Sequence, residues 1–89
     1  MKKKFLEADY FFLRRDYAEA AFLYTELVKE YPANANFNFL AGASYLSIPG
    51  QKGRAIPYLE KAVSSIAAGY REGSYKEEDA PKEALFALG

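Results

Sequence analysis

Apolar side chains recur at three- and four-residue steps along most of this chain, a spacing that places them on one face of an α-helix. The clearest stretch reads DYAEAAFLYTELVKEYP and covers residues 16–32. Its apolar positions are Ala20, Leu23, Tyr24, Leu27, Val28 and Tyr31. Pro32 lacks a backbone N–H and disfavours helical geometry in the residue before it. The stretch therefore predicts a helix that begins after Asp16 and ends near Glu30 or Tyr31.

Capping signals support such boundaries. Asp16 followed by Glu19 is typical of a capping box, in which the two side chains satisfy free N–H groups at a helix start. Asp79 and Pro81 are similar signals for the start of a final helix near residue 80. We predict an all-α fold without strands in residues 16–68. The predicted helices lie near residues 2–14, 17–31, 34–48, 53–67 and 80–88.

The helical pattern repeats along the chain. Pairs that match at a shift of 34 or 35 residues are Phe5 with Phe39, Ala8 with Gly42, and Ala20 with Ala55. The one-residue difference falls in the loop IPGQKG at positions 48–53, where turn residues easily accommodate an insertion. A period of about 34 residues between two antiparallel helix hairpins is that of the tetratricopeptide repeat.

On these residues the chain resembles the tetratricopeptide repeat family. Residues 1–33 resemble one repeat and residues 34–68 a second. Small and aromatic residues stand at signature positions of the family, namely Ala8, Phe11, Ala20, Tyr24, Leu27, Pro32, Gly42, Tyr45, Ala55, Leu59 and Ala62. Lys4 and Asn38 depart from the family pattern, which prefers a large aromatic residue there. The resemblance implies a solenoid of helix hairpins.

The remainder of the chain fits the same scheme. Residues 69–79 are expected to be a loop insertion anchored on the helices by Tyr70 and Tyr75. Residues 80–89 then resemble the first helix of a truncated third repeat, with Gly89 opposite Ala8 and Gly42. We expect this helix to dock back on the helix at 53–67. The prediction is thus one tetratricopeptide-like domain over residues 1–89, with two repeats and one extra helix.

A narrower resemblance covers residues 55–63, AIPYLEKAV, and residues 70–89, YREGSYKEEDAPKEALFALG. These segments are similar to the repeat arrays of Gram-negative envelope proteins of the Bacteroidetes type. In such proteins the array often precedes a β-propeller and a peptidoglycan-binding domain like that of OmpA, and some members serve type IX secretion. The resemblance implies a fragment of a larger protein of the periplasm or cell envelope. The absence of cysteine is compatible with the cytoplasm as well.

Composition argues against several functions. The chain has 89 residues, with 12 basic and 12 acidic side chains, so it lacks the basic excess of a nucleic-acid-binding protein. No apolar run approaches the length of about 20 residues that crosses a bilayer. The chain contains no histidine and no cysteine, which removes the commonest general base, thiol nucleophile and zinc ligands. We expect neither enzymatic activity nor a cofactor.

One acidic run contains the carboxylates that a metal site would need. Glu77, Glu78 and Asp79 could offer carboxylates to calcium, but they lack the alternating spacing and turn glycine of a calcium-binding loop. We interpret the run as a solvated loop that ends in a helix cap. No residue is therefore predicted as a metal ligand.

The remaining candidate is a protein-binding surface. The family resemblance implies a concave groove lined by the first helix of each pair. Its ligand-contacting positions carry over to Lys2, Phe5, Asp9, Phe12 and Leu13, and to Asn36, Phe39, Ala43, Leu46 and Ser47. Among these we predict that the partner is bound by Phe5, Asp9, Phe12, Phe39, Ala43 and Leu46. The alternative for Phe5 and Phe39 is that they pack between the two units as core.

Two functions follow from this surface. The first is a protein–protein interaction or scaffold module, whose groove holds a peptide, a helix or an adjoining domain. It requires the apolar stripe of Phe5, Phe39 and Leu46 to remain partly exposed. The alternative is a structural module that self-associates, so that the partner is another copy of the chain. Under both hypotheses the small residues at helix crossings, Ala20, Gly42, Ala55 and Ala62, should be buried.

Overall fold

Every regular element in the computed structural model, which describes residues 1–88, is a helix. The helices are α1 (Lys2–Leu13), α2 (Tyr17–Glu30), α3 (Ala35–Leu46), α4 (Lys52–Ala62) and α5 (Glu83–Leu88). Within these residues the only β-type pairing is an isolated bridge between Ile66 and Ala80. The all-α prediction is confirmed. Gly89, expected opposite Ala8, lies outside the described residues, as does the side chain of Leu88.

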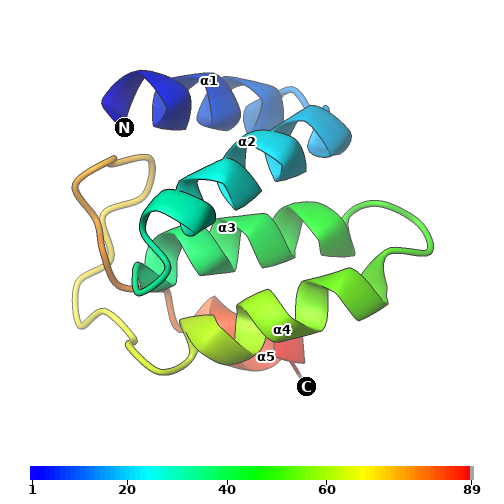
Figure 1. The fold of residues 1–89 in the computed structure, drawn as a ribbon. Helices are drawn as coiled ribbons and strands as arrows, with labels where there is room; N and C mark the ends of the chain where they lie inside the picture. The colour runs from blue at the N-terminus through cyan, green and yellow to red at the C-terminus, as the bar shows by residue number, and fades with distance from the viewer. Residues whose placement is uncertain (89) are drawn as a thin grey trace.

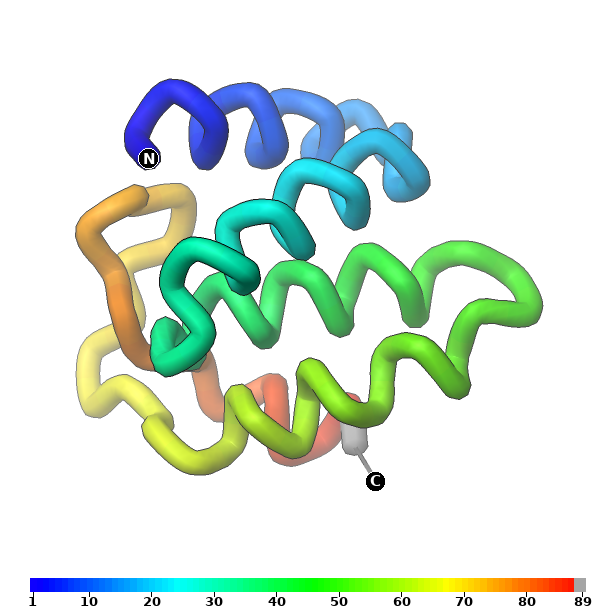
Figure 2. Tube along the Cα trace, in the orientation of Figure 1, coloured from blue at the N-terminus to red at the C-terminus, as the bar shows by residue number. Residues whose placement is uncertain are grey.

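The helices pack in chain order, each against the next, from α1 to α4 (Figure 1). Successive helices run in opposite directions, so α1 pairs with α2 and α3 pairs with α4, as the chain trace makes clear (Figure 2). Helix α5 lies against α4. The predicted docking of the final helix within the chain is therefore confirmed.

The turn between α2 and α3 is fixed by polar side chains. Helix α2 ends at Glu30, as expected from Pro32. The Asn34 side chain caps α3 by accepting a hydrogen bond from the backbone N–H of Phe37 at 2.9 Å. The buried Asn38 side chain donates to the carbonyls of Pro32 at 3.1 Å and of Asn34 at 2.9 Å. This residue thus joins α3 to the end of α2.

The start of α2 differs from the predicted capping box. Asp16 is the N-cap residue, but its side chain makes no capping hydrogen bond; its carboxylate lies 3.5 Å from Nε of Arg14 instead. The turn is formed by the backbone. The N–H groups of Arg15 and Asp16 donate to the carbonyls of Phe12 and Phe11 at 3.0 Å and 2.9 Å, with Arg15 at a φ of 67°. This is the Schellman arrangement at the end of α1.

Helices α4 and α5 are both shorter than predicted. Helix α4 ends at Ala62 because the chain then pairs with residues ahead of α5. The N–H of Ala67 donates to the Ala80 carbonyl at 2.8 Å, and the N–H of Ala80 donates to the Ser65 carbonyl at 2.9 Å. The predicted cap by Asp79 is wrong, because its carboxylate accepts a 2.6 Å hydrogen bond from the Ser65 hydroxyl. Helix α5 begins only at Glu83.

The small residues expected at helix crossings are buried, as predicted. Ala20, Ala55 and Ala62 have no exposed surface, and Gly42 is also buried. The main core cluster lies among α1, α2 and α3 and contains Phe5, Ala8, Ala20, Tyr24, Leu27, Phe37, Leu40 and Ala41. A second cluster, formed by Ala35, Ala62, Ala80 and Ala84, attaches α5 and the segment before it to α3 and α4. Such small side chains permit close approach of the helices.

Candidate functional site

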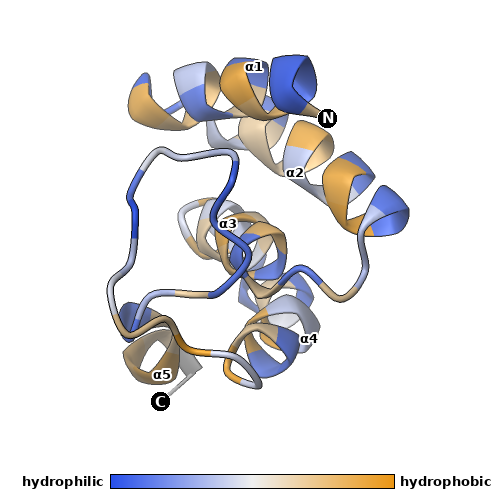
Figure 3. Cartoon of the chain, turned by 90° about the vertical axis from the view of Figure 1, so that its left-hand side faces the viewer, coloured by the Kyte–Doolittle hydropathy of each residue, from blue (hydrophilic) through white to orange (hydrophobic). Residues whose placement is uncertain are grey.

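A long connecting segment, residues 63–82, leads from α4 to α5. It leaves the helical layer, reaches α1, and returns to α5 (Figure 3). Its colouring in Figure 3 is mostly blue to white, so the segment is largely polar. The connecting segment therefore spans from α5 to α1 and passes the N-terminal end of α3 (Figure 1, Figure 3).

Two tyrosines attach the connecting segment to the helices, as predicted. The Tyr70 hydroxyl donates a 2.6 Å hydrogen bond to Oδ1 of Asn36, which is buried at the start of α3. Burial raises the pKa of Tyr70 to about 12, so the hydroxyl stays protonated and able to donate. Tyr75 packs against the main core cluster, and Nζ of Lys2 lies 5.1 Å from the centroid of its ring. That geometry is within the range of a cation–π contact.

Glu77 organises the connecting segment from within. Its side chain is buried, and its carboxylate accepts hydrogen bonds from the N–H groups of Arg71 at 2.8 Å and Asp79 at 3.1 Å. Nε of Arg71 lies 3.5 Å from the same carboxylate. Burial by itself would raise the pKa of Glu77, but the two N–H donors and the guanidinium outweigh it and lower the pKa. The expectation of a solvated acidic run is therefore wrong for Glu77.

Replacing Glu77 with glutamine should destabilise the chain by about 1.5 kcal/mol at neutral pH, because hydrogen bonds to a charged acceptor are the stronger ones. The lowered folded-state pKa sets the pH dependence. The stabilising effect of the Glu77 carboxylate is complete above the ordinary pKa of 4.5. It is lost as the pH falls through the folded-state pKa. Chemical denaturation at several pH values tests this prediction. A difference between wild type and variant that persists unchanged in strong acid would contradict it.

A hollow of about 540 Å³, here called the groove, lies between the helices and the connecting segment. Helix α1 contributes Phe5, Asp9, Phe12 and Leu13, and helix α3 contributes Phe39 and Leu40. Tyr70, Glu72, Gly73, Pro81 and Glu83 form the remaining wall. The groove thus has an aromatic floor from two helices that are not consecutive. Its third side is the connecting segment together with the first residue of α5.

The groove collects four of the six residues predicted to bind a partner. Phe5, Asp9, Phe12 and Phe39 all line it. Ala43 and Leu46 do not, although they lie one and two turns beyond Phe39 on α3 and so share its face. Phe39 is half-buried and Leu46 is 36% exposed, which agrees with the expected exposed stripe.

The exposure of Phe5 differs from that expected for the stripe. Its side chain is only 1% exposed, and its ring packs against Tyr24 and Phe37 at centroid distances of 6.1 Å and 5.9 Å. The expectation that Phe5 remains partly exposed is therefore wrong. The residue is held between α2 and α3, and it forms the bottom of the groove while belonging to the core.

Asp9 is the charged residue on the α1 side of the groove. Its side chain makes no hydrogen bond or ion pair with any of residues 1–88. Burial raises its pKa above the ordinary value of 3.8, and the nearby charge of Glu72 adds to the effect. Since the folded state resists ionisation of this acid, the fold loses stability as the pH rises from 3.8 through the raised folded-state pKa. An uncompensated group of this kind is a candidate for binding.

The Tyr24 hydroxyl lies close to the same region. It is fully buried and has no hydrogen-bond partner among the described residues. Burial raises the pKa of Tyr24 far above its ordinary value, and the negative charge of Asp9, a groove residue, contributes. Replacing Tyr24 with phenylalanine should raise the free energy of unfolding by about 1 kcal/mol, because an unsatisfied polar group is removed. A thermal melt that shows a clear loss of stability would refute this.

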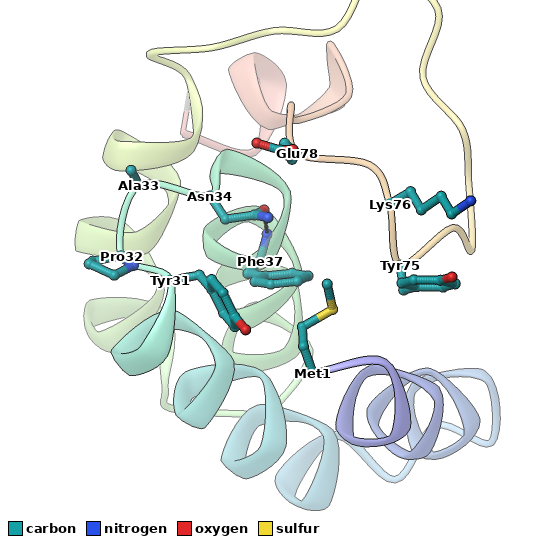
Figure 4. Close-up of a pocket in the computed structure, with 9 residues that line it drawn as sticks. All are labelled: Met1, Tyr31, Pro32, Ala33, Asn34, Phe37, Tyr75, Lys76 and Glu78. Atoms are coloured by element: carbon teal, nitrogen blue, oxygen red, sulfur yellow. Dashed lines mark hydrogen bonds between the residues drawn. The ribbon is translucent and has the colours of Figure 1, made fainter.

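A second hollow, of about 490 Å³, opens between the end of α2 and the connecting segment (Figure 4). Met1, Tyr31 and Phe37 present apolar surface on one side, and Tyr75 faces them from the other. Lys76 and Glu78 supply one charge of each sign, and the Lys76 side chain points away from the opening. Because these two residues carry opposite charges, the second hollow does not favour a ligand of either charge. None of the six predicted residues lines this hollow.

Two general findings limit the chemistry of the described residues. Residues 1–88 contain no group of three or more acidic, histidine or cysteine side chains placed to hold a metal ion. In the same part of the chain, no helix has both the length and the apolar character needed to span a bilayer. Comparison with protein-family models, curated proteins and solved structures found no match to this chain.

Half of the groove could not be identified from the helical pattern. Positions in the connecting segment, Tyr70, Glu72 and Gly73, belong to no periodic element, so no helix face predicts where they lie. The two tyrosines in this polar loop predicted that the loop is anchored on the helices. They did not predict that it forms a wall of the groove opposite α1. Pro81 and Glu83 also line the groove, from the residues before α5 and at its first position.

Proposed function

We propose that this chain is a tetratricopeptide-like module that binds another protein through the groove. The observation that carries the proposal is the groove itself, a hollow of about 540 Å³ with an aromatic floor. Binding sites are typically concave and mostly apolar, with few polar groups that orient the ligand. An extended peptide or a helix of a partner is the occupant that suits a groove between α1 and α3.

The two departures from the family pattern make different contacts. Lys4 on α1 donates a 3.0 Å hydrogen bond to Glu30 at the end of α2. Asn38, its equivalent at a shift of 34 residues, joins α3 to the end of the same helix through the carbonyl of Pro32. Lys4 thus contacts the second helix of its own pair, whereas Asn38 contacts the turn that follows the preceding pair. Support for the repeat assignment comes instead from the antiparallel packing of α1 with α2 and of α3 with α4 (Figure 2). We further propose, from the family resemblance, that the module belongs to a larger protein of the periplasm or cell envelope.

Selection of short random peptides from a display library tests the proposal. We expect wild-type protein to enrich peptides, and hydrogen–deuterium exchange to show that a bound peptide protects α1, α3 and the connecting segment. Replacing Phe39 with serine should then weaken binding. The matched control is Phe22 to serine on α2, since Phe22 is 60% exposed and does not line the groove. Failure to enrich any peptide, or protection confined to other helices, would contradict the proposal.

Self-association is the second candidate, and exposed side chains on α5 favour it. Leu85 is 53% exposed and Phe86 is 75% exposed, and apolar patches of this kind often mark protein interfaces. Sedimentation velocity separates the two functions. A stable dimer at low micromolar concentration that dissociates when Phe86 is replaced by serine would support self-association. A monomer under the same conditions would leave the groove as the proposed binding site.

A further inference from the structure

All of the charged side chains that line the groove are acidic. Asp9, Glu72 and Glu83 line it, whereas no lysine or arginine does. The chain as a whole has as many basic as acidic residues, so this is a local property and not a consequence of net charge. None of the three carboxylates has an ion pair or side-chain hydrogen bond to the described residues. The groove therefore presents unneutralised negative charge.

The walls beside these carboxylates are aromatic. Phe12 and Phe39 are half-buried and contribute ring surface from α1 and α3, and Tyr70 contributes a ring from the connecting segment. Its hydrogen bond to Asn36 holds that ring in place. Aromatic faces attract cations, and lysine and arginine bury an apolar stem while their charged end remains near polar groups.

On the basis of the proposed function, we propose that the partner segment inserts a lysine or arginine side chain, flanked by apolar residues, into the groove. The cationic end lies near Asp9 and Glu72, and the flanking apolar residues contact Phe12 and Phe39. The connecting segment is thus part of the binding site and selects the partner by charge. Complementary charge of this kind contributes specificity as well as faster association.

An organic cation fits these residues better than a metal ion does. In residues 1–88 the carboxylates are not gathered closely enough for three of them to share a metal. A side chain that runs along the groove can instead meet Asp9 and Glu72 while its stem covers the aromatic floor. The second hollow offers no such selection, since Lys76 and Glu78 have opposite charges.

The same peptide selection, analysed by sequence, tests this inference. We expect enriched peptides to carry lysine or arginine next to leucine, isoleucine or phenylalanine. Fluorescence anisotropy with one labelled enriched peptide should show affinity about ten-fold lower for the double variant Asp9→Asn, Glu72→Gln. The affinity of wild type should also fall as salt is raised. The matched control is Glu7→Gln, which removes a charge from an exposed position of α1 outside the groove.

The possible results separate this inference from the proposed function. Enriched peptides that are neutral or acidic, or an affinity that the double variant leaves unchanged, would overturn the inference while peptide binding in the groove still stands. Loss of affinity in the Glu7→Gln control equal to that of the double variant would also overturn it, because the effect would then be general. Absence of any enriched peptide would count against both. Circular dichroism of each variant verifies that the helices remain.

Discussion

Replacing Phe5 with alanine should lower the free energy of unfolding by about 3–5 kcal/mol, the usual range for removing a buried phenylalanine ring. The ring is 1% exposed and touches aromatic residues from two other helices, Tyr24 on α2 and Phe37 on α3. Its removal leaves a cavity at the place where three helices meet. A loss of this size is a large part of the total stability of a small domain.

Urea denaturation followed by circular dichroism measures this loss. The matched control is Leu13→Ala, on the same helix, because Leu13 is 73% exposed and its truncation should change stability little. Should Phe5→Ala retain nearly the stability of wild type but lose peptide binding, Phe5 would be a binding residue and not core. Should both variants be strongly destabilised, the loss of stability would not depend on how deeply the residue is buried.

The position of Phe5 also shows what helical periodicity can and cannot predict. The pattern correctly placed Phe5 and Phe39 on equivalent helix faces, and the structure brings both to one groove. It could not tell them apart, because a periodic pattern defines one apolar face per helix and not the depth of each residue on it. Phe5 is covered by α2 and α3, whereas Phe39 stays half-buried. That difference comes from packing between helices.

The connecting segment was harder to predict for a different reason. Its position depends on contacts between residues far apart in the sequence, such as Tyr70 with Asn36 and Lys2 with Tyr75. Such contacts leave no periodic trace in a polar loop. The bridge between Ile66 and Ala80 likewise shortened both neighbouring helices. The helices were thus predictable from local pattern, while the wall of the groove required tertiary structure.

Gly42→Ala should lower the free energy of unfolding by about 1–3 kcal/mol, although alanine is intrinsically the better helix former by about 1 kcal/mol. A Cβ atom at this position of α3 would lie 2.7 Å from Cγ and 2.8 Å from Cδ2 of Leu59 on α4. It would also lie 3.3 Å from the carbonyl oxygen of Ala55. Leu59 is only 1% exposed, so its side chain has no open space into which it can move.

Gly53→Ala is the matched control for this substitution. Gly53 is exposed in the first turn of α4, and an added Cβ would meet no atom within 4 Å. Here the helix preference of alanine acts alone, and stability should rise by up to about 1 kcal/mol. Thermal or urea denaturation of the two variants should therefore give changes of opposite sign. A gain in stability for both variants would mean that α3 and α4 are not held as closely as the structure places them.

A double-mutant cycle identifies Leu59 as the cause. In a chain that carries Leu59→Ala, the atoms that Gly42→Ala would approach most closely are absent, while a tight 3.3 Å contact with the Ala55 carbonyl oxygen remains. Gly42→Ala should then be clearly less destabilising than in the wild-type chain, so the two substitutions are not additive, as expected for residues in contact. If Gly42→Ala remains destabilising by the same amount without the Leu59 side chain, the close approach of α3 and α4 at Gly42 has another cause, namely the backbone of α4 itself.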